Sequence, residues 1–295
     1  MGSFKNIQKN KDIDAKYVRR VIVYLESEED YQIFKERWFY DQGEFLEFQS
    51  ADSGMGGGCG QVMTLVESDR EKGIIAFGIV DRDALMTYNK WNIFWETDDD
   101  KYVNAKPLGE YVRPLCRWEI ENYLLDPEEI ENILADVGKN APRKNRPVEI
   151  VVEELLKHCD TLIPVMAANI LLHQKNKKAL GTEYQLKIFD RQSMDDITQE
   201  ILVKRLDNEE QDIETYKKYM LKIESFSANT PEGSMEKWDC LNRMIDGKCL
   251  YRRITKIHNL SNKFRYQLAR QIRQKDRIKS EIINIIEYFK KQCPA

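Results

Sequence analysis

Two apolar stretches of this chain end abruptly in acidic side chains. VIVYLE closes in Glu26, with Asp30 four residues further on, and IIAFGIVDRD closes in Asp81 and Asp83. Carboxylates held close together repel one another and lose their ionisation unless a cation neutralises them. Oxygen ligands without His or Cys fit Mg²⁺ or Mn²⁺ rather than zinc. One such acid alone would be an ordinary helix cap or loop residue, but the repetition in two stretches predicts a divalent metal site.

The segments around these acids predict an α/β fold. Apolar, β-branched runs indicate strands over residues 17–26, 44–52 and 74–81, and periodic runs indicate helices over residues 28–40 and 62–73. Alternating strands and helices build a parallel sheet with crossover helices. Functional groups gather at the carboxyl ends of the strands in such a sheet. Glu26, Asp81 and Asp83 therefore converge if the first and third strands are neighbours.

The rest of the chain is predicted to be mainly helical. NIFWET (92–97) and EYVRPLC (110–116) are candidate further strands, and a helix follows Asp126, its N-cap, with Pro127 at the first helical position. Helical periodicity dominates beyond the polar turn at 140–147. We therefore expect three parts: a flexible N-terminus over 1–17, an α/β catalytic domain over 18–135, and a mainly helical region over 136–295.

The charge of the chain is unevenly distributed. The segment from Lys248 to Lys291 holds 13 Lys and Arg and three acids, a net charge of +10, so the remainder carries −14. Such a basic tail fits either a polyanion-binding face or an ordinary solvated helix. If it binds nucleic acid, we expect salt-sensitive, sequence-tolerant phosphate contacts. The exposed basic residues proposed for these contacts are Arg252, Arg253, Lys256, Arg270, Arg273 and Arg277.

The composition argues against several classes of protein. The six cysteines form no CxxC pair, and the three histidines lie far from paired cysteines, which disfavours a disulfide framework and a zinc site. The longest apolar run, Ile74–Val80, is too short to span a bilayer, and the N-terminus lacks the apolar core of a secretory signal. We expect a cytoplasmic protein with reduced thiols.

The glycine-rich segment Gly54–Gly60 has some features of a phosphate-binding loop. It lacks the Gly-Lys-Ser/Thr ending of a Walker A motif. We interpret it as a flexible turn into a helix, whose backbone amides could also contact a nucleic-acid phosphate. We do not expect this chain to hydrolyse ATP by itself.

The motifs together resemble the Toprim family. A strand closing in Glu, a helix, a glycine-containing loop and a strand closing in Asp-x-Asp form the Toprim signature, represented here by VIVYLE and GIVDRD. RWEIENYLLDPEEI is similar to a segment of the Toprim proteins related to OLD-family nucleases, the DUF4435 group. The similarity in sequence covers residues 18–131. Beyond them, the chain is similar to this group only in its length and its helical character. Ser27 lies where many Toprim proteins have glycine, and this difference disfavours the assignment of the chain as a topoisomerase or primase.

The resemblance implies metal-dependent phosphodiester chemistry in a Toprim domain. Two Mg²⁺ or Mn²⁺ ions would share the acids. Asp81 and Asp83 would bind metal, and Glu26 would be a metal ligand or the general base. Asp30 and Glu121 would complete a second metal site.

Two assignments implied by the resemblance have alternatives. Glu119 is easily confused with Glu121, because residues two apart on a strand face the same side. Lys248 follows Gly247 and resembles a lysine that supports the departing charge in OLD-type Toprim domains. An ordinary surface lysine would look the same in the sequence.

The size, the context of Glu26 and the basic tail most resemble the Toprim effector subunits of the PARIS anti-phage defence system. The resemblance implies a toxic endoribonuclease that cleaves host tRNA and arrests translation once it is released from an inhibitory ABC-type ATPase partner. We expect the freed subunit to form a homodimer. One alternative is a DNA nuclease or nickase with the same metals. The other is a non-catalytic assembly subunit, which the full set of acids disfavours.

Overall fold

The chain divides into two compact units. The computed structural model describes residues 20–52, 57–181, 185–207, 209–261 and 263–294. The sheet unit comprises Met1–Val80, Leu108–Pro114 and Ile278–Ala295, and the helical unit comprises Asp81–Pro107 and Leu115–Arg277. This division differs from the expected boundary near residue 135, because the chain leaves the sheet after its third strand and returns to it twice. The expected flexible N-terminus, 1–17, lies outside the described residues.

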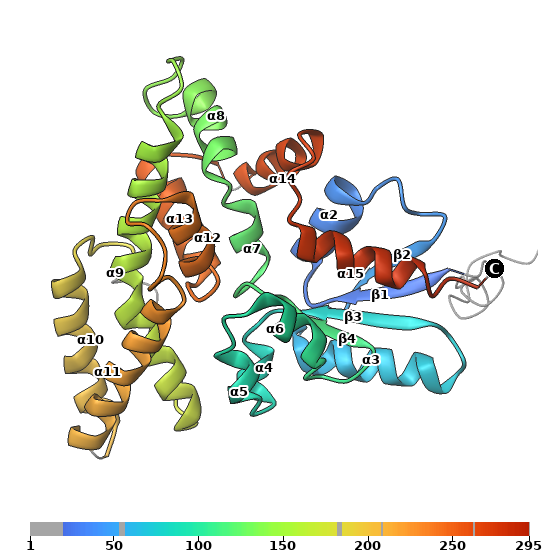
Figure 1. The fold of residues 1–295 in the computed structure, drawn as a ribbon, viewed down its shortest axis with the longest axis horizontal. Helices are drawn as coiled ribbons and strands as arrows, with labels where there is room; N and C mark the ends of the chain where they lie inside the picture. Colours follow the sequence, from blue (N-terminus) through green and yellow to red (C-terminus); the bar gives the residue numbers. More distant parts are fainter. Residues whose placement is uncertain (1–19, 53–56, 182–184, 208, 262, 295) are drawn as a thin grey trace, which may run out of the picture. The chain divides into compact units, whose positions relative to one another are not determined.

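The sheet unit contains a four-stranded, all-parallel sheet (Figure 1). Its strands, in the spatial order β2-β1-β3-β4, are β1 (Val21–Leu25), β2 (Leu46–Ser50), β3 (Ala76–Val80) and β4 (Val112–Pro114). Every residue of β1 and β3 is buried, as expected for parallel strands covered on both faces. The predicted parallel sheet is confirmed, and so is the adjacency of its first and third strands.

The pairing of β1 with β3 fixes where the two acid-bearing segments leave the sheet. Leu25 pairs with Ile79, so both strands end at the same edge. Glu26 is the next residue after β1 in the sequence, and Asp81 is the next residue after β3.

Helices cover both faces of this sheet (Figure 1). They are α2 (Glu28–Ile33), η1 (Phe34–Trp38), α3 (Cys59–Glu71) and α15 (Ser280–Lys290). The Phe77 ring stacks on Phe289 of α15 at 4.4 Å between centroids, which places α15 on one face. On the other face, a Cβ at Gly78 would come within 2.4 Å of Val62 in α3. Glycine at this position therefore allows α3 to approach the sheet closely.

The helical unit is built around one long helix, α9 (Val148–Gln174). It is long and apolar enough to cross a membrane by length and composition, but 83% of its most apolar window is buried within the structure. It therefore has the character of a core helix. The other helices of this unit are α4 (Ala84–Thr87), α5 (Trp91–Phe94), α6 (Asp99–Ala105), α7 (Ile120–Leu124), α8 (Pro127–Val137), α10 (Arg191–Arg205), α11 (Glu209–Ser225), α12 (Met235–Leu241), α13 (Gly247–His258) and α14 (Phe264–Gln274).

The local predictions have mixed outcomes. The helix expected over 28–40 forms, but its second half is wound as the π-helix η1. The expected strand at 110–116 is β4, and Asp126 caps α8 by accepting from the backbone N–H groups of Glu128 and Glu129. The strand expected at 92–97 is wrong. This segment contains the helical turn α5, whose Phe94 N–H donates to the Lys90 carbonyl at 2.9 Å.

Glu131 should make the stability of the protein sensitive to acid. Its buried carboxylate accepts from Arg143 Nη2 at 3.0 Å and from the Arg146 backbone N–H at 2.7 Å. Burial acts to raise the pKa of Glu131, but these hydrogen bonds outweigh it and lower the pKa to about 2. The stabilisation is therefore complete above the ordinary pKa of 4.5 and is lost as the pH falls through about 2.

The variant Glu131→Gln should lower the free energy of unfolding by about 2 kcal/mol at pH 7. Urea unfolding from pH 7 to pH 2 should show this difference shrinking towards zero, while the exposed control Glu210→Gln matches the wild type throughout. A difference independent of pH would show that the loss comes from packing rather than from the carboxylate charge.

Candidate functional site

Ser27 and Asp30 form the start of α2 in the sheet unit. The Asp30 backbone N–H donates to Ser27 Oγ at 3.1 Å, while Ser27 donates to the Asp30 carboxylate from its backbone N–H at 3.2 Å and from its hydroxyl at 2.7 Å. This reciprocal capping box explains a serine at the position after Glu26, because glycine could not supply the hydroxyl. The Asp30 carboxylate thus has a structural role at this turn.

Two glycines of the glycine-rich segment lie against the backbone of Glu26. The Gly58 N–H donates to the Glu26 carbonyl at 3.4 Å, and a Cβ at Gly57 would lie 2.5 Å from the same oxygen. Gly58 has φ +105°, a conformation that favours glycine, and it directly precedes α3. The predicted turn into a helix is therefore confirmed at its end, while residues 53–56 lie outside the described residues.

Lys248 connects acids of the helical unit that are far apart in the sequence. Its ammonium lies 2.7 Å from Glu119 Oε2 and 3.7 Å from Asp81 Oδ2, and its backbone N–H also donates to Glu119. Burial acts to lower the pKa of Lys248, but Glu119, Asp81 and Glu121 more than reverse this effect and raise it. Lys248 therefore stays protonated at neutral pH and is the cation that Glu119 and Asp81 contact.

Glu119 contributes to raised pKa values at two neighbouring carboxylates, Asp83 and Asp246. Solvent reaches the Asp83 side chain, but the surrounding protein desolvates its carboxylate and, together with Glu119, raises the pKa of Asp83 to about 6. Burial and Glu119 likewise raise the pKa of Asp246 to about 7. Desolvation is the larger cause of both shifts, and repulsion by Glu119 adds to it, since the carboxylates around Lys248 outnumber it.

Asp246 is a member of this cluster that the sequence predictions missed. It caps α13 by accepting from the Cys249 backbone N–H at 2.6 Å. The signal was present in the sequence, because Asp246 lies two residues before Lys248 in DGKCLYRRI. An Asp before a helix is so commonly a cap that it gives no warning of a second role.

Arg82, between the two aspartates of the Asp-x-Asp motif, was also missed. Its guanidinium is buried and donates to the carbonyls of Cys116, Phe94 at 2.7 Å and Glu96 at 3.0 Å. Its backbone N–H donates to the Trp118 carbonyl at 2.9 Å. Arg82 therefore links the turn that carries Asp81 and Asp83 to the segment that leads to Glu119.

Glu119 and Glu121 do not lie on a strand. Glu119 is the N-cap of α7, and Glu121 lies in its first turn, so the two carboxylates have different surroundings. Glu119 contacts Lys248, whereas Glu121 is fully buried and lies 3.2 Å from Arg265. Glu119 is thus the acid of this segment in direct contact with the Asp81–Lys248 group.

The basic tail forms three helices, α13, α14 and α15. The prediction that Arg253 is exposed is wrong. Arg253 is fully buried, donates to the Ile188 carbonyl and lies 4.8 Å from the Phe189 ring centroid. It follows Leu250 by three residues on the buried face of α13, so the helical spacing that makes a core also encloses this cation.

The other predicted phosphate-binding residues differ in what they contact. Arg277 pairs with Asp126, Glu128 and Glu129. Arg273 lies 3.4 Å from Asp276. By contrast, Arg252, Lys256 and Arg270 are exposed. The exposed three are available to a polyanion, whereas Arg277 already has acidic partners.

The acids match the ligand preference of Mg²⁺ in their chemistry, since Asp81, Asp83, Glu119 and Asp246 offer oxygen donors only. Among the described residues, no three His, Cys, Asp or Glu side chains are gathered in metal-binding geometry. Instead, the Lys248 ammonium contacts Glu119 and Asp81. A metal ion would therefore compete with Lys248 for these carboxylates.

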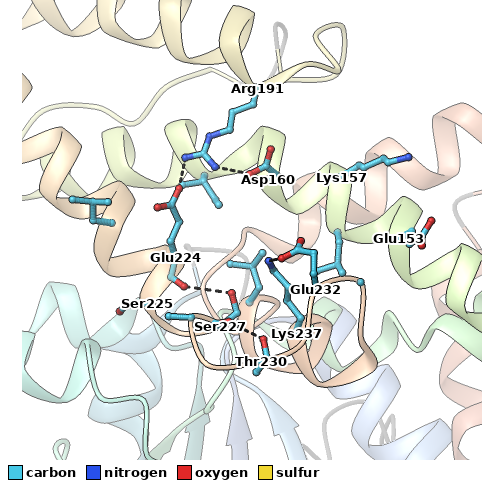
Figure 2. A pocket seen from close by; sticks show the side chains of 16 residues that line it. Glu153, Lys157, Asp160, Arg191, Glu224, Ser225, Ser227, Thr230, Glu232 and Lys237 are labelled. Carbon is cyan, nitrogen blue, oxygen red and sulfur yellow. Dashed lines mark hydrogen bonds and ion pairs between the residues drawn. The ribbon is translucent and has the colours of Figure 1, made fainter.

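A pocket of about 790 Å³ in the helical unit is lined by residues that do not belong to the cluster around Lys248 (Figure 2). Arg191 lies between Asp160 and Glu224, and Lys237 contacts Glu232. The acids that line it, Glu153, Asp160, Glu224 and Glu232, outnumber its bases, Lys157, Arg191 and Lys237. This charge balance does not suit a polyanion.

The candidate residues thus form a carboxylate cluster around Lys248 in the helical unit, whereas Glu26 lies beside a capping box in the sheet unit. No family model, no curated protein and no solved structure matches this chain.

Proposed function

We propose that this protein is a Mg²⁺- or Mn²⁺-dependent nuclease of Toprim type. The observation that carries the proposal is the parallel pairing of β1 with β3, whose next residues in the sequence are Glu26 and Asp81. Two strands ending at one edge of a parallel sheet are where such a fold gathers functional groups. The excess of carboxylates around Lys248 adds a physical reason for a bound divalent cation.

We assign the metal to Asp81, Asp83 and Glu119 of the helical unit, and Glu26 stays a proposed metal ligand or general base on the strength of the sequence motif. Glu119 is preferred to Glu121 because it shares Lys248 with Asp81, whereas Glu121 is enclosed beside Arg265. Asp30 stays a proposed ligand of a second ion. When bound, a divalent ion of this kind lowers the pKa of a water and stabilises charge on phosphate oxygens.

Lys248 supports departing charge in this proposal. Its ammonium is protonated at neutral pH and contacts Glu119. A substrate phosphate oxygen could replace Glu119 as its partner, because both are anionic acceptors. The exchange would place a positive charge beside the substrate and would release Glu119 to bind metal.

The substrate and the regulation of the enzyme belong to the same proposal. We propose a toxic endoribonuclease of an anti-phage system that cleaves host tRNA, is restrained by an ABC-type ATPase and forms a homodimer when free. The exposed cations Arg252, Lys256 and Arg270 would hold RNA phosphates. The support for this part is the Toprim-like motif set and the charge of the tail.

The test is direct cleavage by the purified chain. With Mg²⁺ we expect cleavage of tRNA, none with EDTA, and a loss of at least about a hundredfold for Glu26→Ala. The exposed control Glu28→Ala, on the same turn, should cleave like the wild type. Cleaved plasmid with intact tRNA would favour a DNA nuclease. Full toxicity of Glu26→Ala and Asp81→Ala in cells would favour a non-catalytic subunit.

A further inference from the structure

A polar groove lies between α8 and α14 in the helical unit. It has a volume of about 290 Å³, just below the range of about 300–1,000 Å³ for small-molecule sites. Its lining residues, here called the amide groove, are Glu129, Asn132, Asp136, Asn145, Gln271, Gln274 and Lys275. All of them are polar, so a ligand would be recognised by hydrogen bonds rather than by apolar burial.

One wall of the amide groove is already satisfied internally. Asn145 donates to Asn132 at 2.6 Å, and Asn132 donates to the buried Glu129 at 3.1 Å. Lys275 lies 3.3 Å from Glu129. These contacts hold the wall rigid and neutralise its buried carboxylate, so they leave few groups for a ligand on this side.

The opposite wall and the rim offer groups that have no side-chain partner among the described residues. The Gln271 Oε1 atom is buried and accepts no hydrogen bond. Gln274 and Asp136 are exposed and make no side-chain hydrogen bond or ion pair there. Leaving a buried acceptor unsatisfied costs about 1–3 kcal/mol, so a ligand toward which the Gln271 carboxamide turns, and which donates to it, would recover that loss.

A free cation lies one helical turn from these amides. Arg270 is exposed, has no ionic partner among the described residues, and precedes Gln274 by four residues on α14. Residues four apart lie on the same side of a helix. The free groups thus combine carboxamide and carboxylate acceptors with a guanidinium beside them.

We propose that the amide groove binds an unpaired nucleobase that carries an exocyclic amino group, while Arg270 contacts a neighbouring phosphate. Carboxamides pair with the amino edge of adenine, and carboxylates accept from the amino group of cytosine. Uracil has no exocyclic amino group and offers only its ring N3–H as a donor, between two carbonyl oxygens that the acceptors of the groove repel. Unpaired bases are the usual targets of sequence-specific RNA recognition. The proposal deepens the proposed nuclease function, on which it rests, by naming a base preference of its substrate.

Fluorescence anisotropy with labelled twelve-nucleotide oligo(A), oligo(C) and oligo(U), in EDTA, tests the proposal without requiring cleavage. We expect oligo(A) and oligo(C) to bind about tenfold more tightly than oligo(U). The double variant Gln271→Leu/Gln274→Leu should lose this discrimination, and Gln267→Leu, an exposed glutamine of α14 that does not line the groove, should keep it. Arg270→Gln should weaken all three oligonucleotides and reduce the salt slope by about one phosphate contact.

Three results would each overturn the base site. The wild type could bind the three oligonucleotides equally, it could bind none of them, or the double variant could keep the discrimination. Mg²⁺-dependent cleavage of tRNA alongside any of these results would leave the proposed nuclease function standing. Conversely, base discrimination in a chain that never cleaves nucleic acid would overturn the nuclease and leave the base site.

Discussion

Replacing Asp81 or Asp83 by asparagine should reduce Mg²⁺-dependent cleavage by at least about a thousandfold, without unfolding the protein. The amide keeps the shape of the carboxylate but removes the charge that attracts a hard divalent ion. Both side chains are accessible to solvent to some degree, and Asp83 is exposed, so neither substitution leaves a cavity. Cleavage of labelled tRNA in single-turnover assays measures the loss, and thermal melting confirms the fold.

Asp83 should also make the proposed Mg²⁺-dependent cleavage sensitive to pH. The pKa of Asp83 is raised to about 6, so protons compete with metal for its carboxylate below that pH. In the wild type, the Mg²⁺ concentration for half-maximal cleavage should therefore rise as the pH falls below 6. Mg²⁺ should also raise the melting temperature of the wild type but not that of Asp83→Asn.

Asp100→Asn is the matched control for these variants. Asp100 is an exposed aspartate of the same unit, with no ionic partner among the described residues, and its replacement should leave cleavage and the effect of Mg²⁺ unchanged. If folded Asp81→Asn kept more than about a tenth of the wild-type rate, the acid cluster could not be the place of catalysis, since the loss expected there is at least about a thousandfold.

The features that were predictable from the sequence depend on local patterns. The apolar runs of β1 and β3 predict buried parallel strands because every residue in them is apolar or small. Asp126 followed by Pro127 predicts the start of α8 because both residues favour that position. Glu26 and Asp81 could be selected as candidate site residues for the same reason, since each directly follows a strand in the sequence.

The features that were missed depend on contacts between distant segments. Arg253 has the sequence context of an exposed basic helix, but the packing of α13 against Ile188 and Phe189 encloses it. Asp246 has the context of a helix cap, and its proximity to Glu119 arises from the fold. The consecutive residues Ile93, Phe94 and Trp95 are of types that favour a strand, yet the segment forms a helical turn whose Phe94 ring packs against Trp118. Tertiary contacts decide such cases.

Arg82→Met should lower the free energy of unfolding by about 3–5 kcal/mol, the largest stability loss we expect from one substitution. Two effects oppose each other. Removing a buried charge relieves its desolvation, but the three carbonyls that now accept from the guanidinium would lose their donor. Each orphaned buried acceptor costs about 1–3 kcal/mol. Since three acceptors are lost at once and methionine cannot donate, the second effect should prevail.

Urea unfolding measures this loss. For Arg82→Met, the urea concentration at the midpoint of unfolding should fall, while the slope of the unfolding free energy against urea concentration should stay constant, as expected for a change in stability alone. Arg82→Lys keeps the charge and can satisfy some of the carbonyls, so it should recover part of the loss. Arg252→Met, at an exposed position, should stay within about 0.5 kcal/mol of the wild type. If Arg82→Met were as stable as Arg252→Met, the carbonyls would have found other donors, and Arg82 would not be what holds the turn between Asp81 and Asp83 in place.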